Sequence, residues 1–131
     1  MYPEQLMTDV YWGFYGGKYD SCDVFIREVI EYNKNFDKKW IPEEIVFAGT
    51  NVSIQYSYWD DENEEEEEDD FDLVADNKTC FSAGELLYKI HNQVVEKLED
   101  DDHHFFEGLT LWEGENYNNP NSPLYFLNQG S

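Results

Sequence analysis

Apolar residues recur at helical spacing in the segment that begins at Ser82. Ser82 and Glu85 have the spacing of a capping box, in which the serine accepts from the amide of Glu85 and the glutamate reaches back to Ser82. Phe81, just before the serine, can pack on Leu86 as a hydrophobic staple. The pattern predicts a helix from Ser82 to the acidic residues 99–102, with a core face made of Leu86, Leu87, Ile90, Val94, Val95 and Leu98.

An earlier segment has the same helical period. Asp20 or Ser21 can cap it, because both side chains accept hydrogen bonds from amides of a first helical turn. The segment extends to Asp37, and we expect a second amphipathic helix there. Its apolar stripe contains Cys22, Phe25, Ile26, Val29, Ile30 and Phe36.

Strand patterns account for most of the remaining apolar residues. The segment 8–15 alternates Val10, Trp12 and Phe14 with outward residues, and Gly16-Gly17 ends it. The short Gly49-Thr50-Asn51 connection predicts a hairpin between its two flanking strands. The predicted strands are 8–15, 45–48, 52–59, 71–75, 106–112 and 124–127, and residues 114–122, rich in Gly, Asn and Pro, form a loop.

The order of these elements is strand, helix, three strands, helix and two strands, with no regular βαβ alternation. We therefore expect a single α+β domain over residues 1–131, in two layers, with a largely antiparallel sheet of about five to six strands and two helices on one face. A chain of 131 residues is long enough to bury a core without disulfide or metal support.

Charge narrows the range of partners. The chain has eight basic and thirty acidic residues, a net charge of −22, but it is too rich in aromatic side chains for a disordered acidic tail. Such a charge repels nucleic acid and anionic membranes and attracts a basic protein. The first residues carry no basic segment followed by an apolar run, and no stretch is suited to span a bilayer, so we expect a cytoplasmic protein.

The candidate binding site is the acidic run at 60–72, in which every residue except Asn63 and Phe71 is Asp or Glu. Unpaired carboxylates cannot be buried, so we expect an exposed loop, which could serve only to keep the protein soluble. Without its eleven acids, eight basic residues still face nineteen acidic ones, a net charge of −11. Acids beside aromatic rings suit the capture of Lys and Arg, and the predicted partner-binding residues are Tyr56, Tyr58, Trp59, Asp60, Asp61, Glu62, Glu64, Glu65, Glu66, Glu67, Glu68, Asp69 and Asp70.

Other candidate chemistry is weaker. Asp100 to His104, with Glu107, contains metal-ligand types, but the spacing matches neither HExxH nor a calcium loop. His91 lies on the apolar helix face without an assignable nucleophile or acid beside it. Cys22 and Cys80 do not form a CxxC pair, and we expect both to be reduced and structural. We assign no catalytic residue, metal or cofactor, and expect a binding protein rather than an enzyme.

This combination of small size, α+β pattern, strong acidity, many aromatic residues and no catalytic motif resembles the small immunity proteins of bacterial toxin systems, including contact-dependent and other polymorphic toxins. The resemblance implies a protein that binds a cognate toxin domain, typically a basic nuclease, and blocks it. Two alternatives remain open. One is a nucleic-acid mimic that inhibits a DNA-binding protein, and the other is a small-ligand or enzyme domain using His91 or His103.

Overall fold

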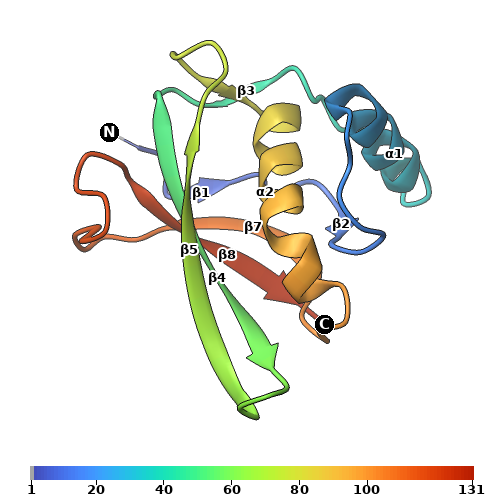
Figure 1. Ribbon diagram of the computed structural model, residues 1–131. Coiled ribbons are helices and arrows are strands. Elements are labelled where there is room, and N and C mark those ends of the chain that lie inside the picture. Colours follow the sequence, from blue (N-terminus) through green and yellow to red (C-terminus); the bar gives the residue numbers. More distant parts are fainter. Residues whose placement is uncertain (1) are drawn as a thin grey trace.

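The computed structural model describes residues 2–131 and has an α+β fold, as the sequence predicts (Figure 1). It contains two helices, α1 (Cys22–Lys34) and α2 (Ala83–Leu98). The strands are β1 (Gln5–Leu6), β2 (Trp12–Gly13), β3 (Ile45–Phe47), β4 (Asn51–Asp60), β5 (Glu65–Val74), β6 (Phe81–Ser82), β7 (Phe105–Leu111) and β8 (Leu124–Gly130).

One six-stranded sheet forms the body of the fold. Its strand order is β1-β7-β8-β4-β5, and β2 also pairs with β7 beside β1. The pairings are antiparallel except for the short parallel contact of β4 with β8. Strands β3 and β6 form a separate antiparallel pair. The predicted, largely antiparallel sheet is therefore confirmed, and β5 is the last strand at one edge.

Both helices begin where the capping signals predict. The hydroxyl of Ser21 accepts from the amide of Val24, and that of Ser82 accepts from the amide of Glu85. Helix α2 lies across one face of the sheet, and α1 packs beside α2 and β2 (Figure 1). None of the helices formed by residues 2–131 is long and apolar enough to cross a membrane. The predicted core face of α2 is fully buried: Leu86, Leu87, Ile90, Val94, Val95 and Leu98.

Only half of the predicted capping box forms. The carboxylate of Glu85 does not reach back to Ser82; it accepts instead from the amide of Asp76 and from Nζ of Lys89, each at 2.8 Å. Lys89 also bonds Asp76, so the competing ion pairs join the start of α2 to the turn before β6. A nearby lysine thus diverts a carboxylate that sequence spacing alone assigns to the helix cap.

The first predicted strand is split in two. Met7 adopts a left-handed backbone with φ of 52°, which turns the chain between β1 and β2 while both still pair with β7. The predicted alternation holds in part: Val10, Trp12 and Phe14 are buried and Tyr11 and Tyr15 are exposed, but Gly13, which the pattern predicts to face outward, is buried as well.

The predicted hairpin between 45–48 and 52–59 is wrong. Strand β3 pairs with β6, and β4 pairs with β5 and β8. The carbonyl of Thr50 accepts from the amide of Ala75, so the residues just before β4 are bonded to the end of β5 and not to β3. Burial of Phe47 and Phe81 then secures the small β3–β6 pair over the core.

The acidic run is also not the loop that we predicted. Only residues 61–64 form a turn, and β5 extends through the acidic residues from Glu65 in unbroken register with β4. The reason is that a two-stranded ribbon can leave both faces in water, so pairing of its backbone does not require burial of its carboxylates. The aromatic and hydroxyl residues of β4 supply the strand-forming partner.

Candidate functional site

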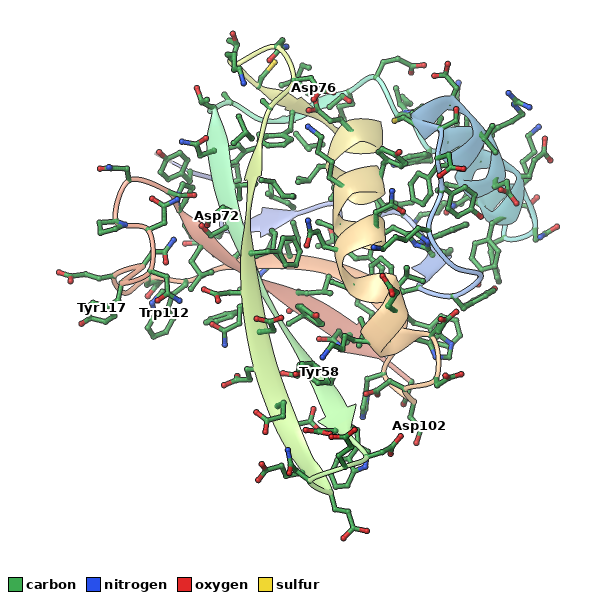
Figure 2. All side chains as sticks on the ribbon, in the orientation of Figure 1. Tyr58, Asp72, Asp76, Asp102, Trp112 and Tyr117 are labelled. Carbon is green, nitrogen blue, oxygen red and sulfur yellow. The ribbon has the colours of Figure 1, made fainter. Side chains whose placement is uncertain are left out.

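The β4–β5 hairpin projects beyond α2 and β8 as a twisted ribbon, and most of the candidate residues lie on it (Figure 1). Its register places acids of β5 directly opposite aromatic residues of β4: Trp59 faces Glu66, and Tyr58 faces Glu67. Side chains alternate along each strand, so Trp59 and Glu66 share one face of the ribbon while Tyr58 and Glu67 share the other. Figure 2 shows acidic side chains spread along both sides of the ribbon to its tip.

The face toward α2 is already occupied by groups of the chain itself. Tyr56 is only 4% exposed, and burial raises the pKa of its hydroxyl to about 12. Lys97 of α2 places Nζ 4.3 Å from the centre of the Tyr58 ring, a cation–π contact on the same face as Glu67. Tyr56 is therefore a core residue, and Tyr58 already holds an internal cation.

The opposite face presents Trp59, whose side chain is 49% exposed. A cavity of about 270 Å³ lies beside it, and its other lining residues are Glu66, His103 and the three aspartates at 100–102. Oδ2 of Asp101 accepts from the backbone amide of Trp59 at 2.7 Å, so the turn between α2 and β7 is held against β4. The indole thus stands next to four carboxylates, and neither Lys nor Arg lines this cavity.

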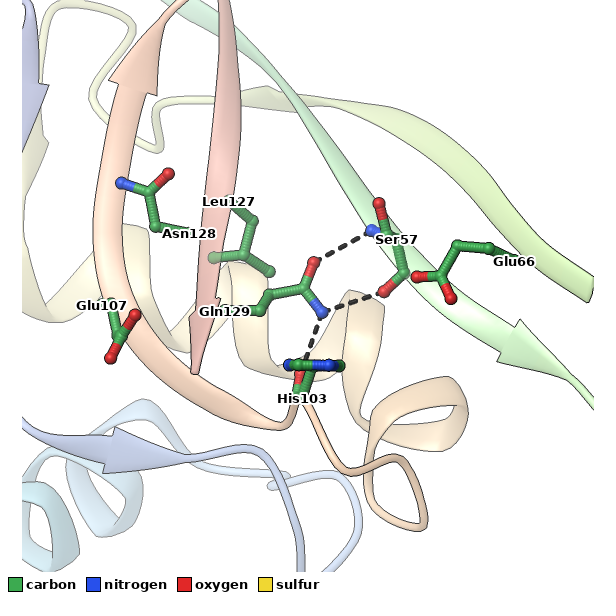
Figure 3. A pocket seen from close by; sticks show the side chains of 7 residues that line it. All are labelled: Ser57, Glu66, His103, Glu107, Leu127, Asn128 and Gln129. Carbon is green, nitrogen blue, oxygen red and sulfur yellow. Dashed lines mark hydrogen bonds between the residues drawn. The ribbon is translucent and has the colours of Figure 1, made fainter. Parts of the chain in front are cut away.

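A second cavity of about 580 Å³ adjoins the first and shares Glu66 and His103 with it (Figure 3). Gln129 forms its wall where β4 and β8 separate. Its amide accepts from the nitrogen of Ser57 and donates to the oxygens of Ser57 and His103, each at 2.9 Å. The side chain thereby makes the hydrogen bonds to β4 that a neighbouring strand backbone would make, and it holds the floor of this second cavity in place. Glu107 adds one more carboxylate to its rim.

Hydrogen bonds and neighbouring charge alter the pKa of two carboxyl groups on the ribbon. The neighbouring Glu65 raises the pKa of Glu67. By contrast, hydrogen bonds from Asn63 and from the amide of Glu62 lower the pKa of Asp60. A positive group placed beside Glu65 and Glu67 would favour the ionised form of both carboxyl groups, since their charges repel each other.

The remaining predicted acids are spread along the ribbon. Those at 61, 62 and 64 lie in the exposed turn. Glu68 accepts a hydrogen bond from Gln55, and Asp70 accepts one from Asn118 of the loop before β8. Asp69 lies opposite the buried Tyr56.

Sequence reasoning assigned no partner-binding role to residues 100–102 or to Glu107. The aspartates are clustered in the sequence, but the cluster was considered there only as a weak metal motif. Asp101 is 42 residues away from Trp59 along the chain, and only the path of α2 back across the sheet brings the two together.

His91 has a structural environment. It is fully buried, its Nδ1 accepts from the indole Nε1 of Trp12 at 3.0 Å, and its Nε2 lies 2.8 Å from the carbonyl oxygen of Gly17. Burial lowers its pKa, and both ring nitrogens are already bonded to protein groups. Within residues 2–131, no three His, Cys, Asp or Glu side chains gather as metal ligands would. Cys22 and Cys80 are free, and burial raises the pKa of the Cys22 thiol.

A third cavity, of about 820 Å³, lies at the other end of the sheet beside Trp112 and Tyr117 (Figure 2). Trp112 is 44% exposed and Tyr117 85% exposed. The loop before β8 forms much of its wall, which includes two prolines and Leu124. Its polar lining includes the carboxylates of Glu4, Glu113 and Glu115 and the hydroxyl of Ser122, so this opening is acidic as well.

Comparison with models of known protein families, with curated proteins and with solved structures gave no match. The chemistry of the site formed by Trp59 and its surrounding carboxylates is therefore the basis for a functional proposal.

Proposed function

We propose that this chain binds a basic protein partner, and that it is an immunity protein which neutralises a cognate nuclease-type bacterial toxin. The observation that carries the proposal is the exposed indole of Trp59 surrounded by the carboxylates of Glu66 and residues 100–102. The binding site is this cavity together with the acidic ribbon that leads to it.

The cavity suits an arginine or lysine side chain. A guanidinium can stack on the indole while the carboxylates accept charge-assisted hydrogen bonds from it. The contact of Lys97 with Tyr58 on the other face of the ribbon is an internal example of the same chemistry. Trp59 has no such internal cation within the described chain, since Lys38, Lys89 and Lys97 make the cation–π contacts that residues 2–131 contain.

A nuclease toxin exposes Lys and Arg to bind phosphate, and the positive electrostatic potential of these residues also attracts an acidic protein. With a net charge of −22, steering would accelerate association by roughly ten- to a thousandfold at low salt. A cytoplasmic location is part of this proposal, because an immunity protein of this type must meet the toxin where its nucleic-acid substrate lies.

One observation favours the nucleic-acid mimic as a second candidate. Acids at 66, 68, 70 and 72 share one face of β5, so carboxylates recur about every 6.7 Å along a straight strand. A mimic relies on this repeated charge, with no single aromatic anchor required. The two functions therefore differ in their dependence on Trp59.

The test is surface-based binding kinetics against the basic toxin domain encoded beside the gene. We expect Trp59→Ala to cost about 2 kcal/mol or more, mainly as faster dissociation. Trp112→Ala is the matched control, because Trp112 is similarly exposed but lies at the other end of the sheet. Replacing the glutamates 64–68 with glutamine should instead slow association, most clearly at low salt.

The outcomes separate the candidates. Loss of binding in Trp59→Ala, together with loss of protection in cells that express the toxin, supports the immunity function. Equal binding by both tryptophan variants, with a strong effect of the glutamine substitutions alone, favours the mimic. A chain that binds no basic domain at low salt contradicts both.

A further inference from the structure

Strand β5 leaves a long edge of the main sheet open. It is the terminal strand, and all ten of its residues pair with β4 on one side without a register shift. It contains neither proline nor glycine. Edges of this length usually carry a bulge, a proline or inward-pointing lysines, because unpaired amides and carbonyls attract other strands.

Hydrogen bonds elsewhere in the chain identify which backbone groups point outward. The amides of Ser53, Ser57 and Trp59 are bonded on the side of β4 away from β5, to Pro123, Gln129 and Asp101.

The even-numbered residues of β4, from Val52 to Tyr58, therefore direct their backbone groups to β5. Their partners in the register are the odd-numbered residues of β5, from Leu73 to Glu67. The amide of Ala75, which donates to Thr50, continues this alternation. The even-numbered residues of β5 consequently direct their backbone groups to the open edge.

Two of these outward groups are satisfied within the chain. The amide of Asp70 donates to the carboxylate of Asp69, and the carbonyl of Val74 accepts from Lys89. The backbone groups of Glu66, Glu68 and Asp72 make no bond of this kind within residues 2–131. The half of the edge nearest the hairpin tip is therefore the more open half.

Charge decides which strand this edge can accept. Both faces of β5 are acidic from Glu65 to Asp70, so a second copy of β5 would place carboxylates opposite carboxylates, which is unfavourable. An extended segment with Lys or Arg would instead place cations beside those acids. The same charges that prevent self-association therefore select a basic strand.

We propose that β5 extends its sheet by pairing with a strand of the basic partner, one that carries Lys or Arg on both faces opposite Glu65 to Asp70. This inference rests on the proposed function, because it specifies how the cationic partner is bound. Backbone hydrogen bonds would hold the added strand against β5, and the acidic side chains would make the binding specific for a basic strand.

The test uses a pair of variants at one position. Glu68→Pro removes an outward amide together with one charge, whereas Glu68→Gln removes the same charge and keeps the amide. Proline is tolerated at an edge position whose amide does not serve the ladder, so the β4 pairing should survive. The probe is a capped ten-residue peptide that repeats Lys-Lys-Thr-Thr, which places Lys on both faces of an extended strand. Its fully N-methylated form is the control without backbone donors.

We expect Glu68→Pro to bind the peptide about tenfold more weakly than Glu68→Gln, since a hydrogen bond is lost and the ring obstructs the edge. The N-methylated peptide should lose a similar factor on the unmodified protein. In amide hydrogen exchange by NMR, added peptide should protect the amides of Glu66, Glu68 and Asp72.

Equal binding by the two Glu68 variants, with no new amide protection, overturns the strand pairing. The exchange measurement on the unmodified protein decides the matter even if the proline variant does not fold. If the peptide still binds with strong salt dependence, the cationic partner of the proposed function stands and only the edge is excluded. If the peptide does not bind at low salt, strand pairing is rejected, and the kinetics with the toxin domain judge the proposed function separately.

Discussion

The main-chain amide of Trp59 is held by the carboxylate of Asp101, whose Oδ2 accepts its hydrogen bond at 2.7 Å. The other oxygen of the same carboxylate accepts from the amide of His103 at 2.8 Å. One side chain thus bridges β4 and the turn between α2 and β7. It also fixes the backbone from which the exposed indole extends.

We expect Asp101→Ala to destabilise the fold by about 1 kcal/mol, because two amides lose their acceptor. Asp100→Ala is the matched control: it removes the same charge from the adjacent position, which is exposed and makes no side-chain hydrogen bond within the described chain. Urea unfolding of both variants checks the prediction. A loss of stability that is equal in the two would mean that charge, rather than the bridge, is responsible.

Much of the fold was predictable, because its signals are local. The serine caps, the buried stripe of α2 and the strand pattern of 52–59 in β4 depend on neighbouring residues, and each is present in the structure. The split of the first strand was not predictable, since it depends on one left-handed residue, Met7, between two strands that pair with the same β7.

The site was predictable in part. Acidity next to Trp59 marked the correct region, but local charge gave no reason to pair residues 65–70 as a strand, because that pairing depends on β4. The burial of Tyr56 and the approach of residues 100–102 depend on where α2 crosses the sheet. Contacts between residues so far apart in the chain cannot be predicted from the local sequence pattern.

Buried His91 should make the fold sensitive to mild acid. Burial lowers its pKa in the folded protein, while the ordinary value of 6.5 applies to the unfolded chain. Below that value the unfolded chain takes up the proton first, so stability is present above about pH 6.5 and declines as pH falls toward the folded pKa. The slope for one proton is at most about 1.4 kcal/mol per pH unit.

The comparison is with His91→Phe, which has no group to protonate. It should be less stable at neutral pH, because Trp12 and Gly17 lose their hydrogen-bond partner, but its deficit should shrink between pH 7 and pH 5. Chemical unfolding at each pH, together with the ring nitrogen shifts of His91, measures this. A deficit that stays constant with pH, or a charged His91 ring at pH 6, would show that the histidine is not held neutral.

Added salt should raise the melting temperature. With a net charge of −22 and acids adjacent along β5, self-repulsion exceeds the attraction from the exposed ion pairs, such as Lys18 with Glu96. Thermal unfolding between low and physiological sodium chloride is the measurement. The chain with glutamine at positions 64–68 should respond less than the natural one, and a melting temperature that falls with salt would contradict the prediction.

A substitution at Gln129 tests whether this side chain holds the floor of the 580 Å³ cavity that adjoins the Trp59 cavity. Its amide nitrogen donates to the carbonyls of Ser57 and His103, so Gln129→Glu would place a carboxylate against two acceptors. We expect a loss of about 2 kcal/mol, since both donor bonds disappear and the charge faces oxygen atoms. Gln93→Glu is the isosteric control, because Gln93 is exposed on α2 and its side chain makes no hydrogen bond within the described chain.

The two variants carry the same charge change, so general repulsion affects both. We expect the loss in Gln129→Glu to diminish as pH falls far enough to protonate the new carboxyl, which restores one donor. Unfolding curves for the pair at neutral and at acid pH provide the measurement. If the two glutamates destabilise the fold equally at neutral pH, the hydrogen bonds of Gln129 do not stabilise the junction of β4 and β8. Other contacts must then hold the floor of the 580 Å³ cavity.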